Sequence, residues 1–490
     1  MNNNRIRLFF LIIIICIGIF LRIFQLGKLC FWCDEFLAIS YGWQPLKDMV
    51  NYITYKDAHP PLFYALVHFL LKYGNSEFYL RLLPSFFGII TIPLAYFIGK
   101  EFSKNEKTGI IFSIIISLNP ALILWSRILK SYSLFTFFLL LSLFFFLKIL
   151  KSDRKKYYIF LFFSDIILLY LHNFAFIWIL IEVFTLLFNK MFNKKFLFYY
   201  IFLFLFYLPW LIKIPYQLKF TLGVIRPIPV VLRYPNLFFY FFFGETLHPF
   251  NMKIVIPFLV VLIFILTNSF NALKKEENKK KYLLFLGLFI PLFLVPFPST
   301  VPQNLLPFSI FVFLLLSIGY KKTNFTKFLF LCFFILSSFS TYFYFTGNTK
   351  NFHDVSKLIP YREINEIFSE KLDKDSIIFS NEKRQFFTDK NFSSFDWYYK
   401  GNTKVIEVAK SPGSIDEIKK ICKSYNKIGL FLNYNEDNEW NNELKNFFFE
   451  NFFPVYQAKF FHNEKLLSRL KGKKEYYWFI EIYIFEKHKK

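Results

Sequence analysis

Carboxylates and an imidazole gather in the first polar stretch of this chain. Asp34 and Glu35 are adjacent, and Asp57 and His59 precede a proline pair at 60–61. Acidic residues beside a membrane lose solvation and repel one another, so they need a reason to be there. Transfer of a group to a hydroxyl needs a carboxylate to take the proton and a cation to stabilise a departing phosphate. We therefore predict catalytic roles for these four side chains, with helix caps or ordinary loop acids as the alternative.

Basic and phenolic side chains form a second set where the third long apolar run ends. Arg127, Lys130 and Tyr132 lie there within six positions of one another. Two cations and a phenol at a membrane edge suit a lipid phosphate, because charge-assisted hydrogen bonds to phosphate are strong. Long basic side chains that reach for the headgroups are the alternative. Arg226 and Arg233, in a later polar stretch, are further candidates for the same phosphate.

Two other pairs carry weaker signals. Glu245 and His248 are three residues apart and would join a metal site if they faced the first polar stretch. No cofactor is otherwise indicated, and a divalent metal at this pair is left open. His172 and Asn173 stand between two apolar runs with almost no loop, where a buried, hydrogen-bonded histidine is the default and a site role the alternative.

The composition places the chain among polytopic membrane proteins. It has 490 residues, of which 55% are hydrophobic, and its mean hydropathy is +0.38. The net charge of +25 does not predict nucleic-acid binding, because the basic residues separate apolar runs and form no stripe. Cys30 and Cys33 have redox spacing without a βαβ context, so a local disulfide or two inert thiols is favoured over a redox role.

About eleven membrane-spanning helices are predicted from apolar runs. The runs are 8–26, 80–99, 109–125, 131–150, 157–171, 173–189, 196–214, 253–272, 282–297, 304–319 and 325–345. Alternate gaps are rich in lysine, around residues 100–107, 151–156, 190–195, 274–281 and 321–327. Lysine-rich gaps face the cytoplasm, so the N-terminus is predicted to be cytoplasmic and the candidate residues external.

The composition divides the chain into two domains. Residues 1–345 form the predicted membrane domain, with a catalytic first external loop at 27–79 in which 61–73 is an interfacial helix. Residues 350–490 are more polar, and helical and strand patterns alternate along them. We therefore predict a small external α/β domain at the C-terminus.

The order of these motifs resembles a known family, the C-type glycosyltransferases that use polyprenyl-phosphate sugars. Protein mannosyltransferases and lipid A aminoarabinose transferases are its relevant group. The resemblance rests on Trp32-Cys33-Asp34-Glu35, Asp57-Ala58-His59-Pro60-Pro61, the stretch 74–85, the stretch 126–134 and Leu171-His172-Asn173. It covers about the first 345 residues and implies the polytopic α-helical fold of that family.

The resemblance implies an enzyme that moves a sugar from a polyprenyl-phosphate donor to a lipid, glycan or protein acceptor. Asp34 would be the base, with Glu35 beside it, and Arg127 and Lys130 would hold the lipid phosphate. The chain departs from the family at Lys130, where arginine is usual, and at Gln303-Asn304, where an Arg-Tyr pair is frequent. We expect a multi-pass protein of the plasma (inner) membrane, with a cell-envelope polymerase or ligase, or a transporter of lipid-linked sugars, as alternatives.

Overall fold

The computed structural model describes residues 3–222, 229–247, 249–297, 300–320, 323–346, 360–382, 393–408, 415–434, 438–464 and 477–487. The chain divides into two compact units. The first contains residues 1–26 and 45–351, and the second contains residues 27–44 and 352–490. The segment 27–44, which the sequence assigns to a loop of the membrane domain, therefore folds with the C-terminal residues.

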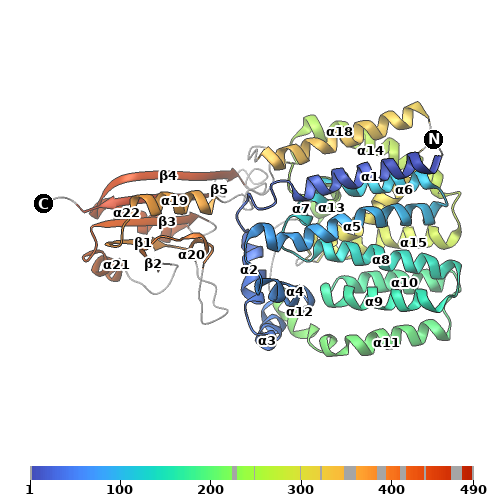
Figure 1. The fold of residues 1–490 in the computed structure, drawn as a ribbon, viewed down its shortest axis with the longest axis horizontal. Helices are drawn as coiled ribbons and strands as arrows, with labels where there is room; N and C mark the ends of the chain where they lie inside the picture. The colour runs from blue at the N-terminus through green and yellow to red at the C-terminus, as the bar shows by residue number, and fades with distance from the viewer. Residues whose placement is uncertain are drawn as a thin grey trace. The chain divides into compact units, whose positions relative to one another are not determined.

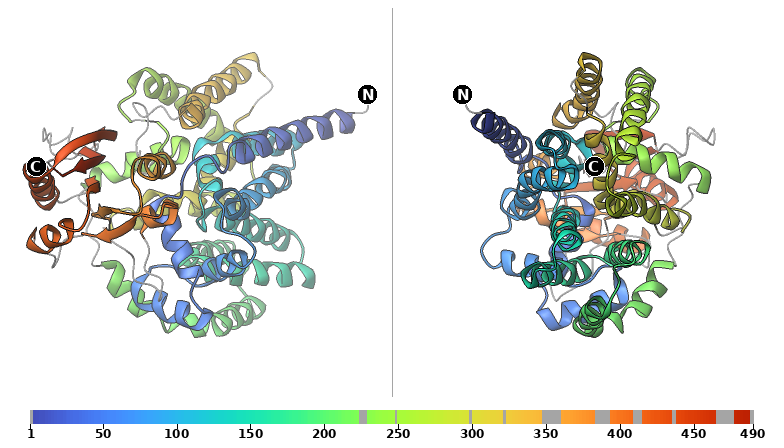
Figure 2. Two further views of the ribbon diagram at one scale, coloured as in Figure 1. Left: turned by 60° about the vertical axis from the view of Figure 1, so that its left-hand side comes forward. Right: turned by 90° about the vertical axis from the view of Figure 1, so that its right-hand side faces the viewer.

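The first unit is a bundle of helices that run side by side (Figure 1) and are seen end-on in the right-hand view of Figure 2. Its long helices are α1 (Asn3–Ile23), α5 (Glu77–Ser103), α6 (Glu106–Leu118), α8 (Tyr132–Lys151), α9 (Lys155–Leu171), α10 (Ala175–Phe188), α11 (Lys194–Leu211), α14 (Met252–Leu273), α15 (Asn278–Phe289), α17 (Ser309–Ile318) and α18 (Asn324–Thr346). Each of the eleven predicted apolar runs coincides with helix, so the fold class is confirmed.

Fewer helices than the predicted eleven are long and apolar enough, each by itself, to cross a membrane. Within the described residues, five helices are long and apolar enough, namely α5, α8, α11, α14 and α18, or six if a bent pair is one span. The outward faces are also apolar: Phe198, Phe202 and Phe206 on α11 are 59%, 55% and 58% exposed. A continuous apolar surface of this kind is unfavourable in water but is expected where a helix faces lipid.

The predicted span 109–125 is two helices rather than one. α6 ends before Asn119, and α7 (Pro120–Ser126) leaves it at an angle of 58°. Pro120 lacks the N–H that a continuous helix needs. Asn119 begins the new helix instead, because its side-chain oxygen accepts the N–H of Leu122 at 2.9 Å and its amide donates to the Phe241 carbonyl at 2.9 Å. The bend directs the following residues into the bundle.

Several shorter helices accompany the long ones. They are α3 (Leu46–Lys56), α4 (Leu62–Leu71), α12 (Ile214–Leu222), α13 (Val230–Phe243), the single-turn α16 (Pro302–Leu305) and the 3₁₀ turns η1 (Ile290–Leu294) and η2 (Leu306–Phe308). The helix predicted at 61–73 corresponds to α4. Arg233, which the sequence analysis placed in a polar stretch, lies on the helix α13. Pro235 inside α13 interrupts the apolar pattern that would have revealed this helix.

The lysine-rich gaps at 100–107, 151–156, 190–195 and 274–281 lie together at one end of the bundle. Ion pairs join them, with Lys104 to Glu277 at 2.7 Å and Lys151 to Glu101 at 3.3 Å, and Lys195 pairs with Asp153. Because α9 runs from Lys155 to Leu171, the residues that follow it are at the opposite end. The same end receives α3, α4 and α12 (Figure 1). The candidate residues near 57, 130 and 172 are therefore separated from the lysine-rich end by the length of the helices.

The second unit contains a five-stranded mixed sheet in the order β2-β1-β3-β5-β4. Its strands are β1 (Ser376–Ser380), β2 (Lys404–Glu407), β3 (Lys427–Tyr434), β4 (Phe453–Glu464) and β5 (Tyr477–Glu486). β1 pairs in parallel with β2 and β3, in the register Ile377 to Lys404 and Ile377 to Ile428, whereas β5 pairs antiparallel with β3 and β4. The prediction of alternating strands and helices here is confirmed, although the pattern predicted neither β4 nor the short helix at Ser394–Tyr398.

Helices complete this unit. They are α19 (Tyr361–Lys371), α20 (Ser394–Tyr398), α21 (Ile415–Cys422), α22 (Asn438–Asn451) and, from the N-terminal segment, α2 (Cys33–Gly42). A core cluster of Leu430, Phe448 and Phe485 joins the sheet to its helices. β1 is completely buried and β3 almost completely, as expected where helices cover a sheet, whereas the edge strand β2 is partly exposed.

α2 is held by aromatic contacts with α20. The N–H of Phe31 donates to the Tyr398 hydroxyl at 2.6 Å, and the ring of Phe36 lies 5.8 Å from that of Trp397 and 6.0 Å from that of Tyr398. Trp43, which follows α2, lies 4.9 Å from Trp397. These rings anchor both ends of the helix that carries the acidic pair.

Candidate active site

The loop between α3 and α4 holds an aspartate and a histidine in direct contact. Asp57 ends α3, and Pro60 and Pro61 lead into α4, so the backbone between them has little freedom. One carboxylate oxygen of Asp57 accepts the backbone N–H of His59 at 2.8 Å and lies 2.7 Å from its Nδ1. The other accepts the hydroxyl of Tyr64 at 3.0 Å. Asp57 is 5% exposed, so this pair is shielded from water.

The charge state of Asp57 follows from these contacts. Burial works to raise the pKa of its carboxyl, but the charge and hydrogen bonds of His59 and the charge of Lys130 together hold this pKa below its ordinary value. Asp57 is therefore ionised near neutral pH. A carboxylate that accepts from Nδ1 leaves Nε2 of His59 as the nitrogen available to a ligand.

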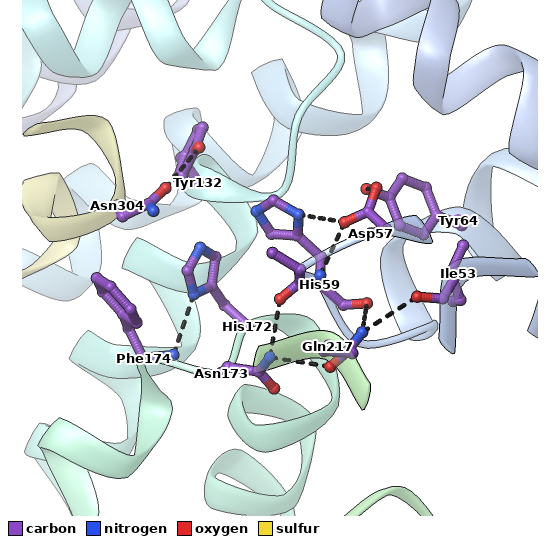
Figure 3. Close-up of polar contacts among 11 residues, drawn as sticks. Ile53, Asp57, His59, Tyr64, Tyr132, His172, Asn173, Phe174, Gln217 and Asn304 are labelled. Atoms are coloured by element: carbon purple, nitrogen blue, oxygen red, sulfur yellow. Dashed lines mark hydrogen bonds and ion pairs between the residues drawn. The ribbon is translucent and has the colours of Figure 1, made fainter. Parts of the chain in front are cut away.

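Two amide side chains fix the same loop from the helices beside it. The Asn173 amide donates to the Ala58 carbonyl at 2.8 Å and to the Gln217 side chain at 3.0 Å. The Gln217 amide in turn donates to the carbonyls of His59, at 2.9 Å, and Ile53, at 3.4 Å. α12 and the α9–α10 turn therefore hold the loop in place through its backbone carbonyls, and these contacts do not involve the His59 side chain (Figure 3).

His172 lies beside His59 in the turn between α9 and α10. The two rings are 4.9 Å apart and nearly perpendicular, and the Phe135 ring stacks on His172 at 5.5 Å. The N–H of Phe174 donates to Nδ1 of His172 at 3.1 Å. His172 is 2% exposed, and burial together with the neighbouring His59 charge holds its pKa well below the ordinary value. The prediction of a buried, hydrogen-bonded histidine is thus confirmed, with Nδ1 as the bonded atom. Nε2 has no well-aligned hydrogen bond among the described residues.

Lys130, Tyr132 and Asn304 complete the group. The Tyr132 hydroxyl donates to the Asn304 side-chain oxygen at 2.9 Å, and both Lys130 and Tyr132 are buried. The charge of Lys130 acts on both Asp57 and His172. Figure 3 shows Nε2 of His59 and Nε2 of His172 directed toward the space that Tyr132 and Asn304 border. Two imidazoles and a phenol therefore border one space on which the charge of a buried lysine acts, an arrangement suited to an anionic ligand.

The other predicted phosphate ligands occupy different places. Arg127 donates from Nη1 to the carbonyls of Leu21 and Arg22, both at 3.1 Å, and from Nε to the Tyr344 hydroxyl at 3.1 Å. It therefore ties α1 to α18. Arg233 on α13 donates to the Pro296 carbonyl at 2.9 Å. Arg226 lies outside the described residues.

The acidic pair at 34–35 begins α2. A carboxylate oxygen of Glu35 accepts the N–H of Trp32 at 2.9 Å, and Glu35 is completely buried. This contact is one half of a capping box, so Glu35 has a structural role at the helix start. Asp34, in the first turn of the same helix, is partly exposed.

Of the two residues predicted to join a metal site, only Glu245 lies within the described part of the chain. Glu245 accepts from the Tyr240 hydroxyl at 3.4 Å, and His248 lies outside the described residues. Within the part of the chain that the structure describes, no three His, Cys, Asp or Glu side chains form a group able to hold a metal ion. Cys30 and Cys33 are free thiols, the first buried and the second exposed.

Sequence reasoning missed Tyr64, Gln217 and Asn304 as members of the group. Tyr64 is seven positions after Asp57 and has a local signal, because it lies in the first turn of α4, next to the loop. Gln217 and Asn304 are polar residues in apolar surroundings, but nothing in the sequence says which loops they meet. Asn304 stands in the stretch noted for lacking the family's Arg-Tyr pair, and it holds Tyr132 there.

Comparison with known proteins agrees with the predicted resemblance. Residues 58–212 match the family described as dolichyl-phosphate-mannose-protein mannosyltransferase. The fold is similar to ArnT from Cupriavidus metallidurans in the apo state, with a TM-score of 0.57 and 8% identity over 96% of this chain and 97% of that one. The same protein bound to undecaprenyl phosphate matches with a TM-score of 0.55, also at 8% identity over 96% and 97% of the two chains. No curated protein sequence matches significantly. The chain thus resembles a family of membrane glycosyltransferases over about a third of its length and has the ArnT fold over nearly all of it.

Proposed function

We propose that this chain, which resembles the protein mannosyltransferases and folds like ArnT, is a membrane glycosyltransferase that uses a polyprenyl-phosphate sugar. One observation carries the proposal: Nε2 of His59, which Asp57 orients, and Nε2 of His172 are directed toward the same space, and the charge of the buried Lys130 acts on both Asp57 and His172. All of these residues except Asp57 lie within the family match at 58–212. The structural relative has been seen with undecaprenyl phosphate, which is the chemistry such a group would bind.

The reaction assigns different tasks to these residues. A sugar leaves its lipid phosphate while an acceptor hydroxyl attacks, so negative charge grows on the phosphate and a proton leaves the acceptor. Lys130 supplies a fixed positive charge for the phosphate, and Asp57 orients His59 toward the same ligand. Asp57 already accepts three hydrogen bonds and so serves as a positioning residue. We assign the base to Asp34, with Glu35 as the cap of its helix.

The decisive experiment is an assay of the purified full-length protein with a panel of polyprenyl-phosphate sugars and membrane acceptors. Release of polyprenyl phosphate together with a glycosylated acceptor is the expected result. Movement of an unmodified lipid-linked sugar across vesicles without release would support a transporter instead. Chain elongation of a bound glycan would support a polymerase. Parallel reactions with and without EDTA test the divalent metal suggested by Glu245 and His248.

We also propose that the lysine-rich end faces the cytoplasm of a plasma (inner) membrane protein, which places the N-terminus inside and the candidate residues outside. The ion-paired lysine gaps support this orientation through the positive-inside rule. The second unit, including Asp416 on α21, would then be external. An Asp416→Cys variant, with the exposed Cys16 and Cys33 replaced by serine, tests the orientation. Labelling of intact cells by an impermeant maleimide is expected, whereas labelling only after permeabilisation would reverse the assignment.

A further inference from the structure

The tautomer of His172 is fixed by its own backbone. Nδ1 accepts the N–H of Phe174 at 3.1 Å, so Nδ1 carries no hydrogen. A neutral imidazole has one proton, and it must then reside on Nε2. His172 therefore presents an N–H donor at Nε2 rather than an acceptor.

This donor has no well-aligned hydrogen bond within the described residues, although the Asn304 side chain is near enough to interact with it. Nε2 of His172 is fully buried, and the residue as a whole is 2% exposed. The ring cannot turn away easily, because Phe135 stacks on one face, at 5.5 Å, and the His59 ring abuts it at 4.9 Å. A buried N–H without a partner costs free energy, and native proteins rarely retain one without an ordered water or a ligand.

The surroundings favour an anionic oxygen as that partner. The charge of Lys130 acts on His172, and Nε2 of His59 points to the same space (Figure 3). The carboxylate of Asp57 is already used by His59 and Tyr64. The Asn304 side-chain oxygen accepts from Tyr132 at 2.9 Å. The Asn304 oxygen has a second lone pair and interacts with His172 without a well-aligned hydrogen bond, so a ligand oxygen would compete with it, and the neighbouring cation favours a negatively charged one.

We propose that Nε2–H of His172 donates a hydrogen bond to a phosphate oxygen of the lipid donor and thereby selects phosphate over a neutral lipid head. This assignment rests on the proposed function, since the phosphate belongs to the polyprenyl-phosphate sugar. His172 holds the phosphate while the glycosidic bond breaks, and no proton needs to leave it. The residue is therefore a neutral donor that complements the charge of Lys130.

Binding to the purified full-length protein tests the assignment without turnover. The probes are undecaprenyl phosphate, undecaprenol and inorganic phosphate. His172→Gln keeps an N–H donor near the place of Nε2, whereas His172→Asn has a donor only near that of Nδ1. We expect His172→Asn to weaken undecaprenyl phosphate binding about tenfold, which is the loss of one charge-assisted hydrogen bond, and His172→Gln to stay within about threefold of wild type. Undecaprenol binding should be the same in all variants, and His68→Asn on α4 serves as the matched control.

The outcomes separate this inference from the proposed function. Wild-type protein that binds undecaprenol as well as undecaprenyl phosphate would overturn the proposed function itself. Wild-type discrimination with an unaffected His172→Asn variant would overturn only the role of His172 and leave a buried water as its partner. Because His172→Asn could fail to fold, the ¹⁵N signal of Nε2 is also followed in wild-type protein. A shift with undecaprenyl phosphate, and a smaller one with inorganic phosphate, supports the assignment, and no shift with either refutes it.

Discussion

Replacing Asp57 by asparagine isolates the contribution of one charge to the candidate site. Asparagine retains the shape of the side chain but loses its negative charge, so the two contacts with His59, at 2.7 and 2.8 Å, become ordinary hydrogen bonds. Charged hydrogen bonds contribute about 1.5–3 kcal/mol and neutral ones about 0.5–1.5 kcal/mol. The side chain is 6% exposed, so solvent screening reduces this difference little. The two contacts together should lose about 2–3 kcal/mol.

This loss of free energy corresponds to a fall in the rate of transfer. If the orientation of His59 matters only when the donor is bound in its reactive form, kcat/KM for the donor should fall about 30- to 150-fold. Initial rates with purified protein at varied donor concentration measure this directly. Asp48→Asn is the control, because Asp48 is an exposed residue on the same helix, and it should change the rate less than about twofold. Folded Asp57→Asn protein with kcat/KM within threefold of wild type would refute the positioning role of Asp57.

The remaining predictions concern the base, the cations and pH. Asp34→Asn should reduce transfer about a hundredfold or more while expression is unchanged, and activity within threefold of wild type would remove Asp34 as the base. Lys130→Gln should raise the donor KM about tenfold or more at unchanged acceptor KM, as measured by initial rates. Arg127→Gln should instead lower the thermal unfolding temperature, because it loses contacts that join α1 to α18; a large donor-specific effect without destabilisation would contradict this. The pKa of Asp57 lies below its ordinary value of 3.8. The stability that its ionised form contributes is therefore complete above that value and is lost as pH falls toward the lower folded pKa. Acid unfolding curves of wild type and Asp57→Asn should accordingly differ above pH 4 and converge below it.

Local spacing allowed one part of the candidate site to be predicted from the sequence. Asp57 and His59 are two residues apart before two prolines, so their contact depends on few backbone angles. The apolar runs were likewise sufficient to predict the helices, because burial in lipid imposes a long, uniform signal. β4 escaped because Pro454 near its start and mixed polar residues disguise an edge strand.

Contacts between distant segments could not be predicted in the same way. Tyr132 meets Asn304 across 172 positions, and Asn173 meets Gln217 across 44. Such pairs depend on how helices pack, and a single sequence carries no record of which loops meet. The capping role of Glu35 shows a related limit, because a capping glutamate and a catalytic one have the same local sequence.

The discontinuity of the second unit has a consequence for recombination between related proteins. α2 carries Asp34 yet rests on Trp397 and Tyr398, which come from more than 350 positions later in the chain. A hybrid that took only residues 352–490 from a relative would replace Trp397 and Tyr398 while keeping the native α2. The aromatic contacts that hold this helix would then be disturbed. A hybrid that exchanged 27–44 together with 352–490 would carry both halves of that contact. Inheritance at these two places is therefore coupled, although one lies near the start of the gene and the other at its end.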